Sequence, residues 1–488
     1  MTLAKGSQLI SRRKFLNTAG AMSLLALTKS NAWAAAQATN AFLSPFFAFD
    51  REIQKFTQAR NIPGAALAVV KDGRLVYTRG YGWADREDKV PVKPTSLFRV
   101  ASISKPLTAV AVLKLVETAK LDLKARLFDL LALGADVVPP PGGKLDERWK
   151  LITVRHLLNH TGGWDRDKSF DPMFRSRQIA TTFGVPSPPA PRVIIRYMLG
   201  KPLDFVPGTS CAYSNFGYCV LGRVIEKIAG TSYEKFVQEN VLAPIGIRQM
   251  RIGASLAEKR VEDEVRYYTP HYETAESVFD DLPSPRSPSD AQRGGDTSNP
   301  PPAPPREGSN RSRTSAEVPS REGQGLGSVK ENIRAGKQVR WPYGGFCLES
   351  MDAHGGWIGS AVDLARFAAA LHDVEHSPLL KLESIQTMHA PPEPPVSRND
   401  DGSLKDHYYG CGWLVRPVGK EANYWHTGSL PGTYTLLVRR HDGVSWAILF
   451  NQRSDDKKLP DSEIDPALHR AAKAVSDWPK YDLFQQYK

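Results

Sequence analysis

Hydrophobic residues near the start of the chain follow the pattern of a β-hairpin. Two apolar runs, 64–70 and 75–77, are separated by the polar tetrapeptide Lys71-Asp72-Gly73-Arg74. An Asp-Gly pair between apolar runs is typical of a tight turn, because glycine readily adopts the positive φ angle that such a turn needs. We therefore expect two antiparallel strands here.

The segment after residue 100 has the period of an amphipathic helix. Its apolar face consists of Leu107, Val110, Val112, Leu113, Leu115 and Val116. Pro106 can occupy only the first turn of a helix, since it has no N–H to donate, so the helix should begin near Ser102. The same period predicts helices over 154–160, 218–229, 363–371 and 466–475.

The pattern returns to strands near the end of the chain. Residues 408–415, 434–439 and 444–450 are rich in β-formers, and Asp442-Gly443 marks a turn between the last two. Strands at both ends with helices between them predict an α/β (α+β) fold, in which one antiparallel β-sheet is flanked by helices and the chain detours through a mostly helical subdomain. We place one catalytic domain at 45–480, with its sheet part at about 45–120 and 405–480 and its helical part at about 121–404.

Residues 283–325 differ in composition from the rest of the chain. They include nine prolines, no aromatic residue, and Val318 as the only large aliphatic residue. Such a segment buries too little apolar surface to offset the entropy of ordering it, so we predict a disordered Pro/Ser/Arg-rich insertion. A proline-rich ligand for a partner protein is the alternative.

The first residues have the pattern of a bacterial export signal. Arg12 and Arg13 stand in the context Ser-Arg-Arg-Lys-Phe-Leu, a short apolar stretch follows, and Ala32-Trp33-Ala34 offers a cleavage site between small residues. The apolar stretch is shorter than the roughly 20 residues that span a bilayer. We expect residues 1–34 to be a twin-arginine signal peptide and the mature protein to be periplasmic or secreted, without stable insertion in a membrane. An amphipathic N-terminal helix is the alternative.

Charge and cysteine content argue against several classes of function. The formal charge is +12, and removal of the five basic residues of the signal peptide leaves +7, spread along the chain without a basic block. A nucleic-acid partner is therefore not indicated. The four cysteines lack the Cys-x-x-Cys spacing of a zinc site and are too few for a disulfide framework. Unpaired thiols are expected, and the even number leaves one disulfide open.

Ser102 and Lys105 are the first candidates for chemistry. They lie three residues apart at the start of a helix, so their side chains share one face. A serine hydroxyl is a poor nucleophile until a base accepts its proton, and a partly desolvated lysine amine can do this. The helix N-terminus adds backbone N–H groups where an oxyanion would form. An N-cap serine on a surface helix is the structural alternative.

Two further groups stand far along the chain. Tyr213 and Asn215 precede a predicted helix; a tyrosine beside a lysine ammonium can relay a proton, and an asparagine can orient the lysine or bind a substrate amide. His426, Thr427 and Gly428 precede a predicted strand, where a polar donor on an edge strand could bind the acyl end of a substrate. Taken singly, each group is also common in a structural role.

The order of these groups, Ser-x-x-Lys, Tyr-x-Asn and then His-Thr-Gly, resembles the penicillin-recognising serine hydrolases. The chain is most similar to their class C β-lactamase branch, which also holds D,D-carboxypeptidases, D-aminopeptidases and esterases. Further phrases between about residues 50 and 455 support this resemblance: LFRVA at 97–101, ITVRHLLNHTGG at 152–163, PGTSCAYSNFGYCVLGRVI at 207–225 and GGWIGSAVDLARF at 355–367. The resemblance implies a β-lactamase/transpeptidase-like fold, with the active site between the sheet and the helical subdomain, and no metal or organic cofactor.

The resemblance also implies a role for each residue. Ser102 would be the nucleophile that forms an acyl-enzyme, and Lys105 would accept its proton. Tyr213 would be the partner base and later the acid. Asn215 would contact the substrate.

On the far side of the cleft the resemblance places His426, Thr427 and Gly428, and it makes the backbone N–H groups of Ser102 and Ser429 the oxyanion hole. β-Lactamases of this branch have lysine where this chain has His426. A lysine is a permanent positive partner for a substrate carboxylate, whereas a histidine is mostly neutral near pH 7. The histidine favours an esterase or a D,D-peptidase-like hydrolase acting on a small ester or a short peptide. A β-lactamase, and a cell-wall-peptide sensor without turnover, are the alternatives.

Two other patterns point elsewhere and are set aside. His156 and His160 have the i, i+4 spacing of metal ligands on a helix, but no glutamate follows His156, so a packing role is preferred. A Gly-x-Ser-x-Gly pattern is absent from the sequence, which argues against a hydrolase of the α/β-hydrolase type.

Overall fold

The computed structural model describes residues 44–279, 337–399 and 401–487. The predicted signal peptide and the predicted insertion at 283–325 therefore lie outside the described residues. The described residues divide into two compact units, one within Thr57–Asp461 and Pro479–Lys488 and one within Met1–Phe56 and Ser462–Trp478. Within the described ranges, no helix has both the length and the hydropathy that a membrane-spanning segment requires.

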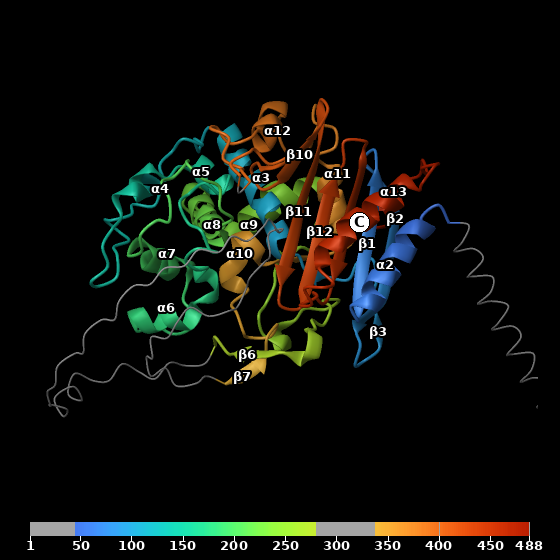
Figure 1. Cartoon of the computed structure of the whole chain (residues 1–488), viewed down its shortest axis with the longest axis horizontal. Helices are drawn as coiled ribbons and strands as arrows, with labels where there is room; N and C mark the ends of the chain where they lie inside the picture. Colours follow the sequence, from blue (N-terminus) through green and yellow to red (C-terminus); the bar gives the residue numbers. More distant parts are fainter. Residues whose placement is uncertain (1–43, 280–336, 400, 488) are drawn as a thin grey trace, which may run out of the picture. The chain divides into compact units, whose positions relative to one another are not determined.

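The larger unit is built on an eight-stranded antiparallel sheet (Figure 1). The strand order is β3-β2-β1-β13-β12-β11-β10-β9, so strands from the beginning and the end of the chain pair at the centre. The predicted antiparallel sheet with a long helical detour is confirmed. The strands are β1 (Gly64–Lys71), β2 (Arg74–Asp85), β3 (Val90–Pro91), β9 (Tyr408–Tyr409), β10 (Leu414–Val418), β11 (Glu421–Leu430), β12 (Thr433–Arg439) and β13 (Val444–Phe450).

The three central strands are buried along almost their whole length. Every residue of β12 and β13 is buried, and in β1 only the last residue is not. α11 (Ala361–Ala369) packs against all three. An apolar run without polar alternation is typical of strands in the interior of a sheet, and residues 436–438 of β12 and 446–450 of β13 form such runs.

The helical part of the larger unit packs around two helices. α3 (Ser104–Glu117) contacts α8 (Asn215–Ala229) and α10 (Asp352–Gly355), and α8 also contacts α5 (Val154–Leu158) and α7 (Pro191–Leu199). The predicted helices are confirmed, with boundaries that differ by two or three residues. The remaining helices of this part are α4 (Leu127–Leu130), α6 (Ser176–Phe183), α9 (Tyr233–Val237) and α12 (Leu382–His389). The four cysteines are unpaired thiols in the structure.

Two small antiparallel sheets lie outside the main sheet and were not predicted. One has the order β4-β8-β5 and the other joins β6 to β7. Their strands are two or three residues long, too short to show a period in the sequence. They are β4 (Phe98–Arg99), β5 (Arg251–Ile252), β6 (Thr274–Glu276), β7 (Gln338–Arg340) and β8 (Trp357–Gly359).

The predicted strand over 408–415 is wrong as a single element. The structure has the two short strands β9 and β10 there, separated by a loop that contains Gly412. Gly412 has φ +79°, and a Cβ atom on it would lie 2.9 Å from the carbonyl oxygen of Lys105 and 2.8 Å from Cβ of Ala109. The strand is interrupted because its backbone passes closely over α3, which a local pattern does not reveal.

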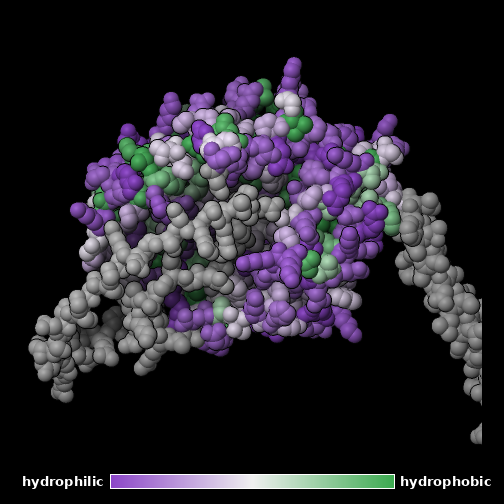
Figure 2. All heavy atoms as spheres, in the orientation of Figure 1, coloured by the Kyte–Doolittle hydropathy of each residue, from purple (hydrophilic) through white to green (hydrophobic). Residues whose placement is uncertain are grey.

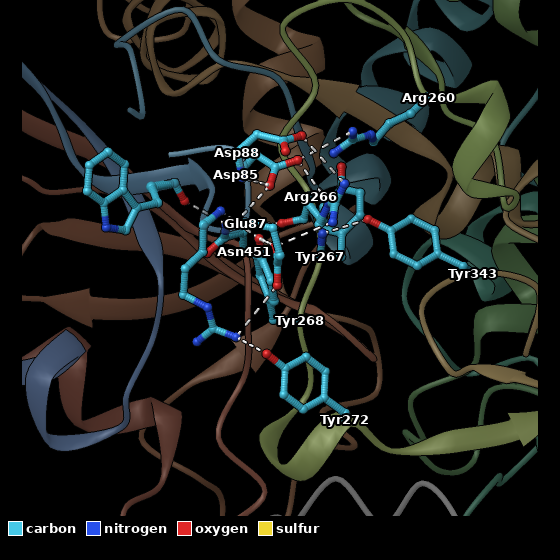
Figure 3. Close-up of polar contacts among 12 residues, drawn as sticks. Asp85, Glu87, Asp88, Arg260, Arg266, Tyr267, Tyr268, Tyr272, Tyr343 and Asn451 are labelled. Carbon is cyan, nitrogen blue, oxygen red and sulfur yellow. Dashed lines mark hydrogen bonds and ion pairs between the residues drawn. The ribbon is translucent and has the colours of Figure 1, made fainter. Parts of the chain in front are cut away.

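A polar network fixes the end of β2 to the segment that follows β5 (Figure 3). Asp85 is buried and pairs with Arg266, whose Nε lies 2.9 Å from its Oδ2. The side chain of Asn451 accepts the N–H of Gly64 at 2.8 Å and donates to the carbonyl oxygens of Trp83 and Arg266, both at 3.0 Å. The network therefore satisfies its buried polar groups while joining β1, β2 and this segment.

The smaller unit contains α13 (Ile464–Lys473) and most of α2 (Phe47–Ala59). Arg470 of α13 pairs with Glu52 of α2 at 3.7 Å, and the ring of Trp478 contacts that of Phe46 edge-on, with centroids 6.0 Å apart. The helix predicted over 466–475 is thus confirmed, two residues earlier in the chain.

Figure 2 shows one face of the molecule coloured by hydropathy. Hydrophilic residues predominate on this face, and hydrophobic residues are scattered between them. Single apolar residues on a surface are normal and do not by themselves mark a binding site.

Candidate active site

Ser102 lies at the start of the helix that carries Lys105. A short 3₁₀ turn, Ala101–Ile103, precedes α3 and lies against β11 and β12. Ala101 has φ +48°, a left-handed conformation that is uncommon for alanine and stores backbone strain. Ser102 is partly exposed, whereas Lys105 is fully buried. The turn therefore presents the serine hydroxyl at the surface above a buried amine.

The amine of Lys105 lies within hydrogen-bond distance of at least three acceptors among the described residues. Its Nζ lies 3.0 Å from Oγ of Ser102, 2.8 Å from Oδ1 of Asn215 and 2.9 Å from the carbonyl oxygen of His354. A lysine ammonium has three donors and satisfies all three groups. In the neutral amine, two N–H groups serve the amide and carbonyl oxygens, and the lone pair faces the hydroxyl of Ser102. The geometry thus suits both protonation states, as a base in a catalytic cycle requires.

Asn215 is oriented by Asp171, which the sequence analysis missed. Nδ2 of Asn215 donates to Oδ2 of Asp171 at 2.6 Å. A carboxylate only accepts hydrogen bonds, so the amide nitrogen must face Asp171 and the amide oxygen must face Lys105. Asp171 itself is held at the start of a 3₁₀ turn, where its Oδ1 accepts the N–H of Met173. Asn215 therefore orients the lysine. Its contact with a substrate stays a prediction.

Two cations lie against the ring of Tyr213. Nζ of Lys105 is 4.6 Å from the ring centroid, and the guanidinium carbon of Arg166 is 4.9 Å from it. Both distances are within the range of cation–π contacts. The rings of His160 and His426 lie 4.4 Å and 6.2 Å away. The structure thus brings Tyr213 to the Ser102–Lys105 pair, as the motif order implies, and adds Arg166.

His426 makes hydrogen bonds with both of its ring nitrogens. Nδ1 lies 2.6 Å from the carbonyl oxygen of Thr427, and Nε2 lies 2.9 Å from Oη of Tyr409. A carbonyl oxygen only accepts, so Nδ1 carries the hydrogen and Nε2 accepts the hydroxyl proton of Tyr409. Burial, together with the charge of Lys105, lowers the pKa of His426 to about 3. His426 is therefore neutral, and a substrate could accept from it only by replacing Thr427.

The His-Thr-Gly triplet precedes β12, as the pattern indicated, and itself lies within the strand β11. β11 is not the edge strand of the sheet, but β10 pairs with it only up to Leu414↔Trp425, so 426–430 has a strand partner on one side only. His426 and Gly428 are buried, whereas Thr427 and Ser429 are partly exposed. Side chains alternate along a strand, so the accessible face of this segment presents the threonine and the serine.

Gly428 allows β11 to approach the turn that carries Ser102. A Cβ atom on it would lie 2.4 Å from the carbonyl oxygen of Val100 and 2.3 Å from Oγ1 of Thr435. Ser429 follows, and its hydroxyl accepts a hydrogen bond from Arg453 at 3.3 Å. The oxyanion hole formed by the backbone N–H groups of Ser102 and Ser429 stays a prediction that this close approach favours.

His156 and His160 have separate structural partners. His156 belongs to the capping box of α5, in which it exchanges hydrogen bonds with Thr153 at 3.3 Å. His160 packs on Tyr213, and its Nδ1 accepts the N–H of Ser214 at 3.2 Å. Among the residues that the structure describes, no group of three or more His, Cys, Asp or Glu side chains is placed to hold a metal ion.

Comparison with known proteins covers most of the chain. The model of the Beta-lactamase family matches residues 49–468. Penicillin-binding protein 4* of Bacillus subtilis (strain 168) is 31% identical over 425 residues, which cover 86% of this chain and 73% of that protein. Protein flp of Staphylococcus aureus (strain COL) is 28% identical over 196 residues, which span 40% of this chain and only 36% of the length of flp.

Solved structures show the same fold at lower identity. The octameric penicillin-binding protein homologue from Pyrococcus abyssi has a TM-score of 0.57 at 20% identity, over 89% of this chain and 78% of that one. The D-amino acid amidase from Ochrobactrum anthropi SV3 has a TM-score of 0.57 at 18% identity, over 87% of this chain and 98% of that one. The family model extends over both the sheet and the helical part, and it confirms the resemblance that the three motifs indicated. The chain belongs to the Beta-lactamase family, within the penicillin-recognising serine hydrolases.

Proposed function

We propose that the protein is a hydrolase that forms an acyl-enzyme on Ser102, with small esters or short D,D-peptides as its substrates. The observation that carries this proposal is the contact of 3.0 Å between Oγ of Ser102 and Nζ of Lys105. Asn215 and the carbonyl oxygen of His354 hold that amine in place. A base fixed at hydrogen-bond distance from a partly exposed serine is the arrangement that nucleophilic catalysis needs.

The reaction proceeds in two proton-balanced halves. Oγ of Ser102 attacks the carbonyl carbon while its proton passes to the Lys105–Tyr213 pair, and the backbone N–H groups of Ser102 and Ser429 stabilise the oxyanion. When this intermediate collapses, the ester or amide bond breaks and the leaving group takes the proton from the pair. A water molecule then attacks the acyl-enzyme and gives a proton to the pair. The acid leaves, and the proton returns to Oγ of Ser102.

The acyl end of the substrate should not need a carboxylate. His426 is neutral and both of its ring nitrogens have protein partners, so position 426 offers no permanent positive charge. By their names, penicillin-binding protein 4* binds penicillin and the D-amino acid amidase acts on amides of D-amino acids. These ligands contain an acyl carbon that a serine can attack. The twin-arginine pattern at 1–34 supports a site of action in the periplasm or outside the cell.

The test is the intact mass of the protein after exposure to a fluorophosphonate and to benzylpenicillin. We expect one adduct on the wild type and none on Ser102→Ala, whose thermal unfolding should match the wild type because only a hydroxyl group is lost. Ser104→Ala is the matched control, because the Ser104 hydroxyl is bound to the carbonyl oxygen of Ala101 at 2.7 Å and takes no part in the reaction. Labelling or turnover by Ser102→Ala at the wild-type rate would overturn the assignment of the nucleophile.

A substrate panel then separates the possible activities. p-Nitrophenyl esters, D-Ala-D-Ala peptides and nitrocefin differ in leaving group and charge, and steady-state kcat/KM ranks them. Preference for uncharged esters or for the peptides supports the proposal, and preference for nitrocefin would make the protein a β-lactamase. An adduct that forms on Ser102 and never hydrolyses with any of them would instead indicate a sensor.

A further inference from the structure

Arg166 shares the ring of Tyr213 with Lys105. The guanidinium carbon lies 4.9 Å from the ring centroid, and Nζ of Lys105 lies 4.6 Å from it. Arg166 comes from the loop that follows α5 and is partly buried. The charge of Arg166 also acts on other residues of the site. The pKa of His354 is lowered first by burial, then by the charge of Lys105 and then by the charge of Arg166. A guanidinium stays charged across the pH range in which enzymes work, so the site has a permanent second cation.

The Lys105–Tyr213 pair must lack one proton before it can accept the proton of Ser102. The pair is then either an amine beside a phenol or an ammonium beside a phenolate. These two forms hold the same number of protons and the same net charge, so they titrate as one coupled pair. Taking up a proton gives the pair a net charge of +1. A permanent positive charge nearby opposes that state, whichever of the two residues has gained the proton.

We propose that Arg166 is a positioning residue of the reaction, a permanent cation that keeps the Lys105–Tyr213 pair one proton short and able to accept the proton of Ser102. The proposal rests on the proposed function, since it concerns the base of that reaction. It assigns Arg166 no contact with the reacting atoms.

Four titratable side chains near the pair are uncharged near neutral pH. His160 on the α5 side and His426 on β11 are buried, and burial together with Lys105 lowers both pKa values, that of His426 to about 3. Tyr218 on α8 and Tyr409 on β9 are also buried, and burial raises both pKa values well above the usual range. These four side chains therefore cannot replace the charge of Arg166.

Among the described residues, two thiols lie close to Tyr409 and Tyr218, and one carboxylate lies close to the pair. Burial raises the pKa values of Cys211 and Cys411 to about 11, so both thiols are neutral. Asp171 is joined to Lys105 through Asn215, and its negative charge favours the protonated pair. Arg166 acts in the opposite direction to this carboxylate, which is why its removal should be visible in the pH dependence.

The experiment is the pH profile of the reaction with an uncharged reagent. The rate of Ser102 modification by a neutral fluorophosphonate, and kcat/KM for p-nitrophenyl butyrate, are measured between about pH 5 and pH 10. In Arg166→Gln the acidic limb of the pH–rate profile should move up by about one pH unit. At a given pH on this limb the reaction should then be roughly tenfold slower, whereas the plateau rate at higher pH should be retained. Arg166→Lys keeps the charge and should keep the limb. Arg166→Met, which preserves packing against the Tyr213 ring, gives a second uncharged variant if Arg166→Gln folds poorly.

Lys168→Gln is the matched control. It removes a positive charge from the same loop, but Nζ of Lys168 is exposed and donates to the carbonyl oxygen of Asp204 at 3.3 Å. Its acidic limb should coincide with that of the wild type. A shift in this variant equal to that in Arg166→Gln would mean that the limb follows the overall charge of the loop, which would overturn the proposal.

Four other outcomes would also overturn it. A uniform loss of rate at every pH in Arg166→Gln would show a structural role alone. A raised KM confined to esters with a free carboxylate, with the limb unmoved for the neutral ester, would make Arg166 a substrate-binding residue. A wild-type protein that never labels on Ser102 would overturn the proposed function and this inference with it, whereas labelling with an unmoved limb in Arg166→Gln would overturn the inference alone.

Discussion

Gly428 lies where β11 passes over the turn that carries Ser102. A methyl group here would lie 2.4 Å from the carbonyl oxygen of Val100 and 2.3 Å from Oγ1 of Thr435. Thr435 also donates a hydrogen bond to that carbonyl oxygen at 2.9 Å, so both atoms are held in place. Gly428→Ala should therefore separate the strand from the turn, lower kcat/KM about 100-fold and cost about 1–3 kcal/mol of folding free energy. Ester hydrolysis and urea unfolding measure the two effects.

Gly217→Ala provides the control for this substitution. Gly217 lies in the first turn of α8, and a Cβ atom on it would meet the carbonyl oxygen of Leu157 only at 3.7 Å, an ordinary contact. Alanine should be tolerated there and should stabilise the helix by up to about 1 kcal/mol. Wild-type activity in Gly428→Ala would show that the reaction does not need β11 to lie against the turn.

The buried ring of His426 should make the stability depend on pH. Its pKa is about 3 in the folded protein, whereas a histidine in the unfolded chain binds a proton near pH 6.5. Between these values the unfolded state holds more protons, so stability falls as the pH falls from about 6.5 toward 3. His426→Gln retains an acceptor for the Tyr409 hydroxyl but does not titrate. Between about pH 7 and pH 4.5 it should lose about 2–3 kcal/mol less stability than the wild type.

Urea unfolding at the two pH values measures this difference directly. Tyr409→Phe provides a companion variant, because it leaves Nε2 of His426 buried without its donor and should cost about 1–3 kcal/mol at neutral pH. If the wild type and His426→Gln lose stability equally on acidification, the ring takes up a proton in the folded state without a cost in free energy. This result would contradict the lowered pKa of His426.

Which site residues the sequence could predict follows from the range of their contacts. Ser102 and Lys105 are three residues apart on one helix, so local spacing already places their side chains together. Asp171, Arg166 and Tyr409 reach the site only through tertiary contacts with Asn215, Tyr213 and His426. No spacing rule links these residues, and their types are common in loops. They could be found only after the fold had brought the three motifs together.

Elements were predicted well where one local preference decides the structure. The β1–β2 hairpin follows from its Asp-Gly turn, and α8 ends at Gly230, which has φ +69°. β11 was not predicted, because its polar and small residues interrupt the alternation that marks a strand. β9 and β10 were predicted as one strand because the break at Gly412 depends on the approach of α3. At Gly412 a tertiary contact therefore overrode the local signal.

The link between β2 and the segment after β5 should be a measurable source of stability. Arg266 is about one-third exposed, but its partner Asp85 has only 9% of its side chain exposed, and their atoms lie 2.9 Å apart (Figure 3). Arg266→Gln leaves this carboxylate without its main cation. The expected cost is about 1–3 kcal/mol in urea unfolding, below that of a fully buried pair because solvent screens the arginine.

An exposed ion pair on the same segment provides the comparison. Lys93 and Asp263 also lie 2.9 Å apart, but their side chains are 57% and 46% exposed. Lys93→Gln should therefore change the free energy of unfolding much less than Arg266→Gln does, because solvent and salt screen an exposed pair. Equal effects of Lys93→Gln and Arg266→Gln would contradict the importance assigned to the burial of Asp85.

In the larger unit, strands from the first and last parts of its sequence build one sheet, and the middle of its sequence builds the helical part. β1 pairs with β13 although nearly the whole unit separates them in sequence, and α3 returns the chain from the sheet to the helices. This arrangement was predictable because the period of the sequence changes twice, from strands to helices and back. The position of Ser102 at the junction follows from it, since the predicted site residues Lys105 and Asn215 come from the helical part and His426 from the sheet.

Removing residues 283–325 tests how independent that segment is of the fold. The described chain stops at residue 279 and resumes at 337, and its two ends are joined by the antiparallel pair β6–β7 and by a hydrogen bond of 2.8 Å from the N–H of Ser277 to the carbonyl oxygen of Lys337. A short Gly/Ser linker in place of 283–325 should therefore span the gap without strain. Shortening the loop lowers the entropic cost of closing it by about 1 kcal/mol. The melting temperature should therefore stay level or rise slightly, and kcat/KM should be unchanged. Deleting 274–340 instead also removes both strands and should lower the melting temperature. A large loss in the first variant would show that 283–325 packs against the folded body.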